Sequence, residues 1–158
     1  MQSAWRTGLA FGMTSGVITT LGLIVGLHSG THSRLAVIGG IATIAVADAL
    51  SDALGIHITE EARARHDTAH VWMATFATFL TKFLMTLTFL VPVLVLELNA
   101  AIIASVVWGV LVLSLLSYLI ARQQAVAPWR IIGEHVAIAL VVIMITYNLG
   151  VWVANHFQ

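Results

Sequence analysis

The sequence contains no cysteine among its 158 residues. This absence excludes disulfide bonds, thiolate metal sites and cysteine nucleophiles together. A metal ion would have to be held by carboxylate, imidazole, thioether or carbonyl groups, which suit Fe²⁺, Mn²⁺, Mg²⁺ or Zn²⁺ better than softer ions.

Charge is also scarce. Only 9% of the residues are charged and the formal net charge is zero with histidine neutral, whereas an ordinary soluble domain has about 25% charged residues. The few basic residues are scattered, so no surface for nucleic acid is expected. With 59% hydrophobic residues, the composition is typical of an integral, multi-pass membrane protein.

Motifs of known enzyme chemistry are missing too. Ser51 and His57 do not form a recognisable nucleophile arrangement, and the sequence has neither a phosphate-binding glycine loop nor a His-Glu-x-x-His pair. We therefore expect no enzymatic activity and no prosthetic group.

Five apolar segments are long enough to cross a bilayer, which takes about 20 residues. They lie at roughly 9–28, 35–56, 74–96, 100–121 and 131–153. We predict a single all-α membrane domain over residues 1–158, with five transmembrane helices and a polar cytoplasmic linker at 57–70.

The basic residues predict the orientation of these spans. With five spans, only Arg34 falls on one side of the membrane, and the other side carries Arg6, Arg63, Arg65, Arg122 and Arg130. Cytoplasmic loops are enriched in Arg and Lys. We therefore expect a cytoplasmic N-terminus, with the cell (inner) membrane as the location.

The first span is rich in glycine at intervals of four residues, at Gly8, Gly12 and Gly16. Small residues in this pattern let two helices approach closely. We predict a homodimer through this glycine-rich helix. The alternative is packing within the chain against the second span, whose Gly39 and Gly40 are also small.

Two acidic residues, Asp48 and Asp52, lie in the middle of the second span. Four residues apart, they share one face of a helix, and ionisable residues inside a membrane mark functional sites by default. Such a pair can bind a hard divalent cation, and repulsion between the two carboxylates lets a proton compete with the metal. Lys82 in the third span could instead snorkel to the cytoplasmic interface or pair with a carboxylate and only fix helix register.

The linker carries a second group of metal-ligand types. If it is helical, His57 pairs with Glu61 and His66 with His70 at a spacing of four residues. Imidazole and carboxylate groups at this spacing can capture a transition metal, although a solvated linker would look the same. At the opposite membrane edge, we expect His28, His32, Glu97 and His156 to occupy solvated loop positions, with metal ligation on the exit side as the alternative.

Two motifs resemble the vacuolar iron transporter family. The stretch 16–26, Gly-Val-Ile-Thr-Thr-Leu-Gly-Leu-Ile-Val-Gly, is similar to the family signature D-G-[LIV]-x-T-x-[FL]-G-L-[VI]-x-G, and the stretch 47–55, Ala-Asp-Ala-Leu-Ser-Asp-Ala-Leu-Gly, is similar to A-G-A-x-S-M-A-x-G-E. The chain departs from these motifs at Ser15, Asp52 and Ile56, which stand where the family has Asp, Met and Glu. It resembles a compact member without the large cytoplasmic metal-binding domain.

The resemblance implies a homodimer of five-span chains that exports Fe²⁺ or Mn²⁺ from the cytoplasm in exchange for protons, along a path at the dimer interface. From the residues of this chain we expect His57, Glu60, Glu61, His66 and His70 to collect the metal ion, and Asp48 and Asp52 to bind it on its way across the membrane. The path would also include Ser51 and, as oxygen ligands from the partner subunit, Ser15, Thr19 and Thr20. Two alternatives are a non-transporting membrane module of the same fold, such as a sensor or an assembly subunit, and an exchanger of protons or monovalent cations.

Overall fold

A computed structural model describes residues 2–63, 67–124 and 126–157. These residues form helices throughout, in the order α1 (Gln2–Thr31), α2 (Arg34–Ala62), α3 (Thr68–Thr88), α4 (Leu90–Val95), α5 (Leu98–Gln124) and α6 (Pro128–Phe157). Within the described part of the chain, five helical stretches are long and apolar enough to cross a membrane, with α3 and α4 together making one of them. All-α architecture and a multi-pass membrane protein follow from these helices.

The helices extend beyond the apolar segments of the sequence, and α2 shows this most clearly. It continues through His57 to Ala62, so the polar linker expected at 57–70 is much shorter. No glycine or proline lies after Gly55 to end the helix earlier. The next helix begins at Thr68, where the carboxylate of Asp67 accepts a hydrogen bond of 2.8 Å from the backbone N–H of His70 and so caps it.

The third span is interrupted near the opposite membrane edge. Pro92 cannot donate a backbone hydrogen bond to Thr88, and its ring crowds that carbonyl. Helix α3 accordingly ends at Thr88, and α4 resumes at Leu90 after a turn at Phe89. The side chain of Phe89 is fully buried at this break.

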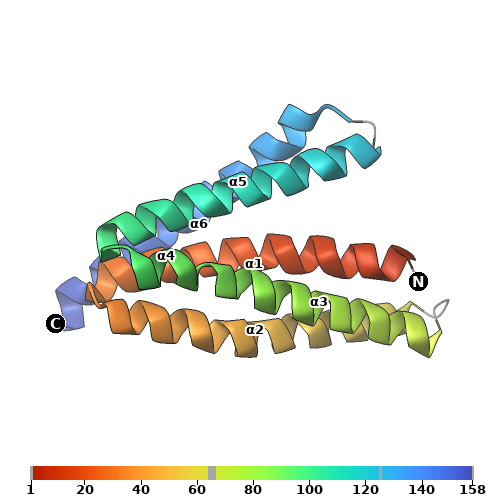
Figure 1. Cartoon of the computed structure of the whole chain (residues 1–158), viewed down its shortest axis with the longest axis horizontal. Coiled ribbons are helices and arrows are strands. Elements are labelled where there is room, and N and C mark those ends of the chain that lie inside the picture. Colours follow the sequence, from red (N-terminus) through yellow and green to blue (C-terminus); the bar gives the residue numbers. More distant parts are fainter. Residues whose placement is uncertain (1, 64–66, 125, 158) are drawn as a thin grey trace.

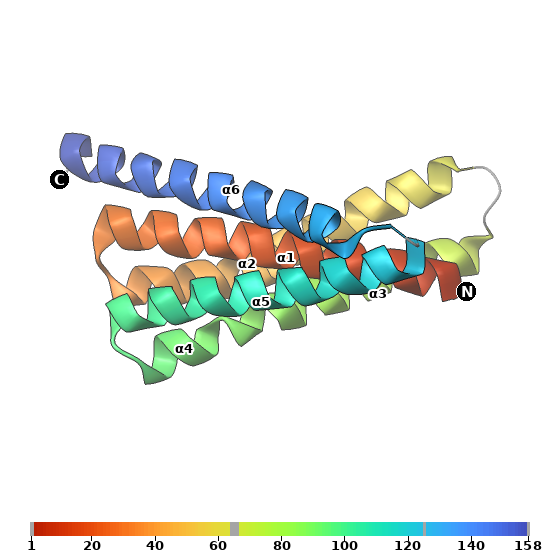
Figure 2. The same cartoon turned by 90° about the horizontal axis from the view of Figure 1, so that it is seen from above.

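Helix α1 runs through the middle of the bundle, with α2 and α3 on one side and α5 and α6 on the other (Figure 1). Viewed from above, α1 lies beside α6 over most of its length (Figure 2). The two chain termini lie at opposite ends of the molecule, as an odd number of spans requires. Because α1 contacts α2, α3, α5 and α6, its side chains influence how closely these four helices can pack.

The first glycine set of α1 lies against α3. A Cβ atom on Gly8 would be 2.6 Å from the Cβ of Ala77, and one on Gly12 would be 2.8 Å from the backbone oxygen of Thr78. These glycines are therefore used within the chain, and the prediction that they pack against a second copy is not borne out. The alternative partner, α2, is not the one they contact either.

A second glycine set on α1 lies against α6. A Cβ on Gly22 would be 2.9 Å from a methyl group of Val142, and one on Gly30 would be 3.2 Å from the backbone oxygen of Gly150. At this contact the hydroxyl of Ser29 donates to the backbone oxygen of Tyr147 at 3.0 Å. Helix α1 thus packs closely against α3 with one glycine-containing face and against α6 with another.

Replacing Gly12 by alanine should destabilise the protein, because the added methyl group meets the backbone of α3 rather than a side chain that can rotate away. Overpacking of this kind costs about 1–3 kcal/mol. The matched control is Gly39→Ala on α2, where an added Cβ meets nothing within 4 Å. Unfolding of both variants in detergent by SDS titration would measure the difference, and equal stability would contradict the close packing of α1 on α3.

Candidate functional site

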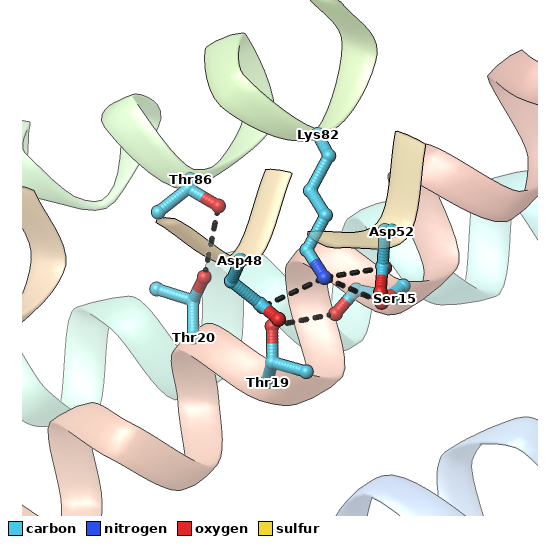
Figure 3. Close-up of polar contacts among 7 residues, drawn as sticks. All are labelled: Ser15, Thr19, Thr20, Asp48, Asp52, Lys82 and Thr86. Carbon is cyan, nitrogen blue, oxygen red and sulfur yellow. Dashed lines mark hydrogen bonds and ion pairs between the residues drawn. The ribbon is translucent and has the colours of Figure 1, made fainter. Parts of the chain in front are cut away.

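The buried amino group of Lys82 joins the two acidic residues of α2 (Figure 3). Its Nζ atom lies 2.6 Å from Oδ2 of Asp48 and 2.5 Å from Oδ2 of Asp52, and the lysine side chain is 0% exposed. Lys82 therefore does not snorkel to the interface. Of the two arrangements that the sequence allowed, the structure has the ion pair, and it involves both carboxylates.

The local geometry of three helices produces this site. Asp48 and Asp52 are one helical turn apart on α2 and point toward α3. Gly16 of α1 lies beneath the alkyl chain of Lys82, and a Cβ there would be 3.5 Å from the lysine Cγ. The lysine stem thus passes over α1 at Gly16 on its way to the carboxylates, at a distance where an added Cβ would make an ordinary contact.

Ser15 of α1 completes the environment of the ammonium group. Its hydroxyl accepts a hydrogen bond of 2.8 Å from Lys82 and donates one of 2.6 Å to Asp52. An ammonium group has three donors, and here it has three oxygen neighbours. Ser15 belongs to the same chain as the carboxylates, so it does not need a partner subunit to reach them, contrary to the expectation from the sequence.

The other residues expected along the transport path lie around the Asp48–Asp52–Lys82 group rather than within it. Thr19 is exposed, and its hydroxyl donates to the backbone oxygen of Ser15 at 2.9 Å. Thr20 is buried, and its hydroxyl donates to that of Thr86 on α3 at 3.2 Å. Ser51 lies on the exposed face of α2.

The site is closed on one side and open on the other. Lys82 is fully buried, but the side chains of Asp48 and Asp52 are 29% and 22% exposed. All three residues lie near the middle of their spans. The two carboxylates with one ammonium leave one uncompensated negative charge on the open side, between α1 and α2.

The linker residues separate into two groups that do not meet the central site. In the first group Glu60 is 3% exposed, with its carboxylate 2.8 Å from Nη1 of Arg63 and 3.6 Å from Nε2 of His70. Burial of a carboxylate requires such partners. This group therefore has the character of a structural contact between the end of α2 and the start of α3.

The second group surrounds His57. The hydroxyl of Thr75 donates to the backbone oxygen of Val71 at 2.8 Å, so at 3.0 Å from Nδ1 of His57 it can act only as an acceptor. This contact holds Nδ1 of His57 against the start of α3. The ring packs edge-on against Trp72, and together with Glu61 it lines a cleft of about 140 Å³.

Within residues 2–63, 67–124 and 126–157, no three His, Asp or Glu side chains are close enough to hold one metal ion together. The predicted metal ligands His57, Glu60, Glu61 and His70 are therefore not gathered into one site with the aspartates. The reason is that His57 and Glu61 face the cleft while Glu60 turns to Arg63 and His70. His66 lies outside the described residues.

Comparisons with protein-family models, curated proteins and solved structures find no match to this chain. The chemistry of the central site must therefore be read from its own residues. That site holds the ammonium group of Lys82 against three oxygen atoms, Oδ2 of Asp48, Oδ2 of Asp52 and the hydroxyl of Ser15.

The sequence carries a further signal on the third span. Thr75, Thr78, Lys82 and Thr86 follow each other on α3 at intervals of three or four residues, so they share one face of the helix. Three of them contact residues of α1 or α2, namely Thr75, Lys82 and Thr86. A polar face on an apolar helix predicts that it turns toward the bundle, and this would have favoured the buried lysine.

Proposed function

We propose that this protein is a cation/proton exchanger of the membrane, with Asp48 and Asp52 as the cation ligands. The ammonium group of Lys82 competes with the cation for these two carboxylates. The observation that carries the proposal is the position of the lysine Nζ, within 2.6 Å of both carboxylates at mid-membrane depth. The ammonium group occupies the place that a metal cation between the two carboxylates would take.

Charge balance explains the coupling to protons. A divalent cation that enters between the carboxylates displaces the ammonium group from its partners. A buried, unpaired ammonium is unstable and neutralises by releasing its proton. One proton therefore leaves as one divalent ion binds, and the site changes from one negative charge to none.

The donor atoms favour a hard divalent ion as the transported substrate. Carboxylate and hydroxyl oxygens suit Mg²⁺, Ca²⁺ and Mn²⁺, whereas imidazole suits Fe, Zn and Cu. Of the two ions implied by the sequence resemblance, Mn²⁺ fits this set better than Fe²⁺. The histidines of the linker are not needed for this step.

The distribution of arginine supports a cytoplasmic N-terminus, the orientation in which the proposed exchanger would export its ion. Arg63, Arg122 and Arg130 lie at the same end of the bundle as Arg6, and Arg34 lies at the opposite end. The excess of basic residues at the N-terminal end is typical of a cytoplasmic face. The cleft beside His57 lies at this end and offers a first contact for ions leaving the cytoplasm.

A homodimer is part of the proposal, because the open side of the site would otherwise face lipid. Asp48, Asp52, Thr19 and Ser51 are all partly or fully exposed in the single chain, and charged groups at mid-membrane depth face protein or water. A second copy on the α1/α2 face, rather than on the glycines, would cover them.

Cysteine cross-linking can test this dimer, since the chain has no native cysteine. We expect Ser51→Cys on the proposed interface to form disulfide-linked dimers in membranes. Leu115→Cys, on α5 and likewise exposed, at 61%, is the matched control and should stay monomeric. Equal cross-linking at both positions, or none at Ser51→Cys, would contradict an interface on the α1/α2 face.

One observation favours a second function, that of a non-transporting membrane module. Lys82 is fully buried, donates hydrogen bonds to Ser15 and Asp52, and forms an ion pair with Asp48, which is what an ion pair that only fixes helix register requires. In that case the carboxylates never exchange the ammonium for another cation.

Ion flux into proteoliposomes distinguishes the two functions. With the purified protein, an outward proton gradient should drive Mn²⁺ uptake, and the uptake should alkalinise the lumen in proportion. Collapsing the gradient with a protonophore should abolish accumulation. Absence of Mn²⁺ flux under a proton gradient would leave the structural role of the Asp48–Asp52–Lys82 group as the correct one.

A further inference from the structure

Two histidines at the end of α1 lie next to each other on the side of the molecule opposite the N-terminus. His28 is in the last turns of the helix, and His32 follows it by one turn. Their ring centres are 5.4 Å apart, with an angle of 49° between the planes. This pair lies outside the central site and plays no part in the proposed exchange.

The spacing of the rings fits shared coordination of one ion. Two imidazoles bound to a tetrahedral ion at metal–nitrogen distances of about 2.0–2.1 Å have ring centres about 5 Å apart. The observed 5.4 Å differs from this by a few tenths of an ångström. A small rotation of the exposed His32 side chain is enough to close the difference.

A neighbouring helix already orients the first of these rings. Nε2 of His28 lies 2.9 Å from Oδ1 of Asn99 on α5. Because the amide oxygen only accepts, His28 donates its Nε2–H, and Nδ1 keeps the lone pair. Histidines that bind metals usually donate their other N–H to such a partner, which fixes the tautomer and the ring orientation.

The backbone at His32 brings the second ring into place. His32 has φ of 49°, the one positive φ at a non-glycine position in the described part of the chain. This conformation is common just after the end of a helix, but glycine or asparagine usually occupies it. Here an imidazole does, and the backbone N–H of His32 still closes the helix by donating to the backbone oxygen of His28 at 3.0 Å.

The end of the helix also favours positive charge. The unpaired carbonyl groups at the C-terminus of a helix carry a partial negative charge, which stabilises cations. Helix α1 ends at Thr31, between the two histidines. A cation held by both rings would therefore lie at the negative end of a long helix.

We propose that His28 and His32 form a binding site for a borderline divalent cation such as Zn²⁺, Ni²⁺ or Co²⁺, with water in the remaining positions. Imidazole ligands suit these ions, whereas the oxygen donors of the central site suit Mn²⁺. This site is exposed at the membrane edge on the side opposite the N-terminus. It differs from the solvated role that the sequence predicted for these residues.

Binding of Zn²⁺ to the full-length protein in detergent tests the site without reference to transport. Isothermal titration should give one Zn²⁺ per chain that is lost or weakened in His28→Gln and in His32→Gln. We expect at least the 10- to 100-fold loss of affinity that follows removal of a ligand's outer partner. His32→Gln keeps the contact between His28 and Asn99, so it separates ligation from folding.

His156→Gln is the matched control. His156 is exposed at the same end of the molecule, but its Nδ1 lies 2.8 Å from the backbone oxygen of Trp152, and it should bind Zn²⁺ as the unchanged protein does. The double variant Asp48→Asn/Asp52→Asn should also retain this Zn²⁺ site. Unchanged affinity in His32→Gln, or loss of the same binding in His156→Gln, would overturn the proposal.

Discussion

Replacing Lys82 by methionine should lower the free energy of unfolding by about 3–5 kcal/mol, the usual cost of removing one partner from a buried ion pair. The methionine fills most of the volume of the lysine stem over Gly16, so the loss comes from charge rather than from a cavity. Two carboxylates and the hydroxyl of Ser15 would be left without their cation.

The triple variant Lys82→Met/Asp48→Asn/Asp52→Asn should recover most of this stability, since it removes all three charges together. Arg122→Met is the control for loss of a basic residue at an exposed position and should change stability by no more than about 0.5 kcal/mol. SDS or thermal unfolding in detergent measures all three. A Lys82→Met variant as stable as the unchanged protein would show that the ion pair contributes nothing to the fold.

Asp48→Asn and Asp52→Asn should each abolish most Mn²⁺ transport in proteoliposomes while leaving the protein folded. Each variant keeps one carboxylate against Lys82, so the ammonium retains a partner. The bound cation, by contrast, loses one of its two charged ligands. We expect flux to fall by at least about 10- to 100-fold, because removal of even an outer partner of a ligand has an effect of that size.

Glu134→Gln is the matched control for this measurement. Glu134 is an exposed carboxylate in the first turns of α6, away from the central site, and its neutralisation should leave Mn²⁺ flux unchanged. Retained flux in both aspartate variants would contradict the assignment of the cation ligands. Loss of flux in Glu134→Gln to the same extent would point to a general effect of carboxylate charge.

Helix positions were predictable because each depends on the local sequence. Apolar length alone located the five membrane-crossing stretches of the described chain, and arginine placement separated its two ends. The ends of the helices were harder to predict, because the polar residues 57–62 continue α2 beyond the point where the apolar segment ends. The capping residue Asp67 was the available signal for the start of α3.

Helix neighbours could not be predicted in the same way. The glycine spacing of α1 correctly indicated close packing, but spacing contains no information about which helix approaches. Gly8 and Gly12 contact α3, and Gly22 contacts α6, whereas a second copy or α2 was expected. Only the three-dimensional arrangement distinguishes these partners.

The candidate site was predicted in part. Asp48 and Asp52 were found because acidic residues are rare at the centre of a membrane span. The position of the Lys82 side chain could not be decided from sequence, since a long flexible side chain reaches either the interface or a neighbouring helix. In the structure the Nζ atom lies within 2.8 Å of both carboxylates and of the Ser15 hydroxyl, so the side chain reaches the neighbouring helices.

The ion pair between α2 and α3 has a consequence for biogenesis. A charged residue at the centre of a span costs about 2.5–3.5 kcal/mol to insert, so α2 with two aspartates and α3 with a lysine are each poor candidates for insertion alone. As an antiparallel hairpin they neutralise two of these three charges. We therefore expect α2 and α3 to leave the translocation machinery together, because the lysine of α3 neutralises one of the aspartates of α2.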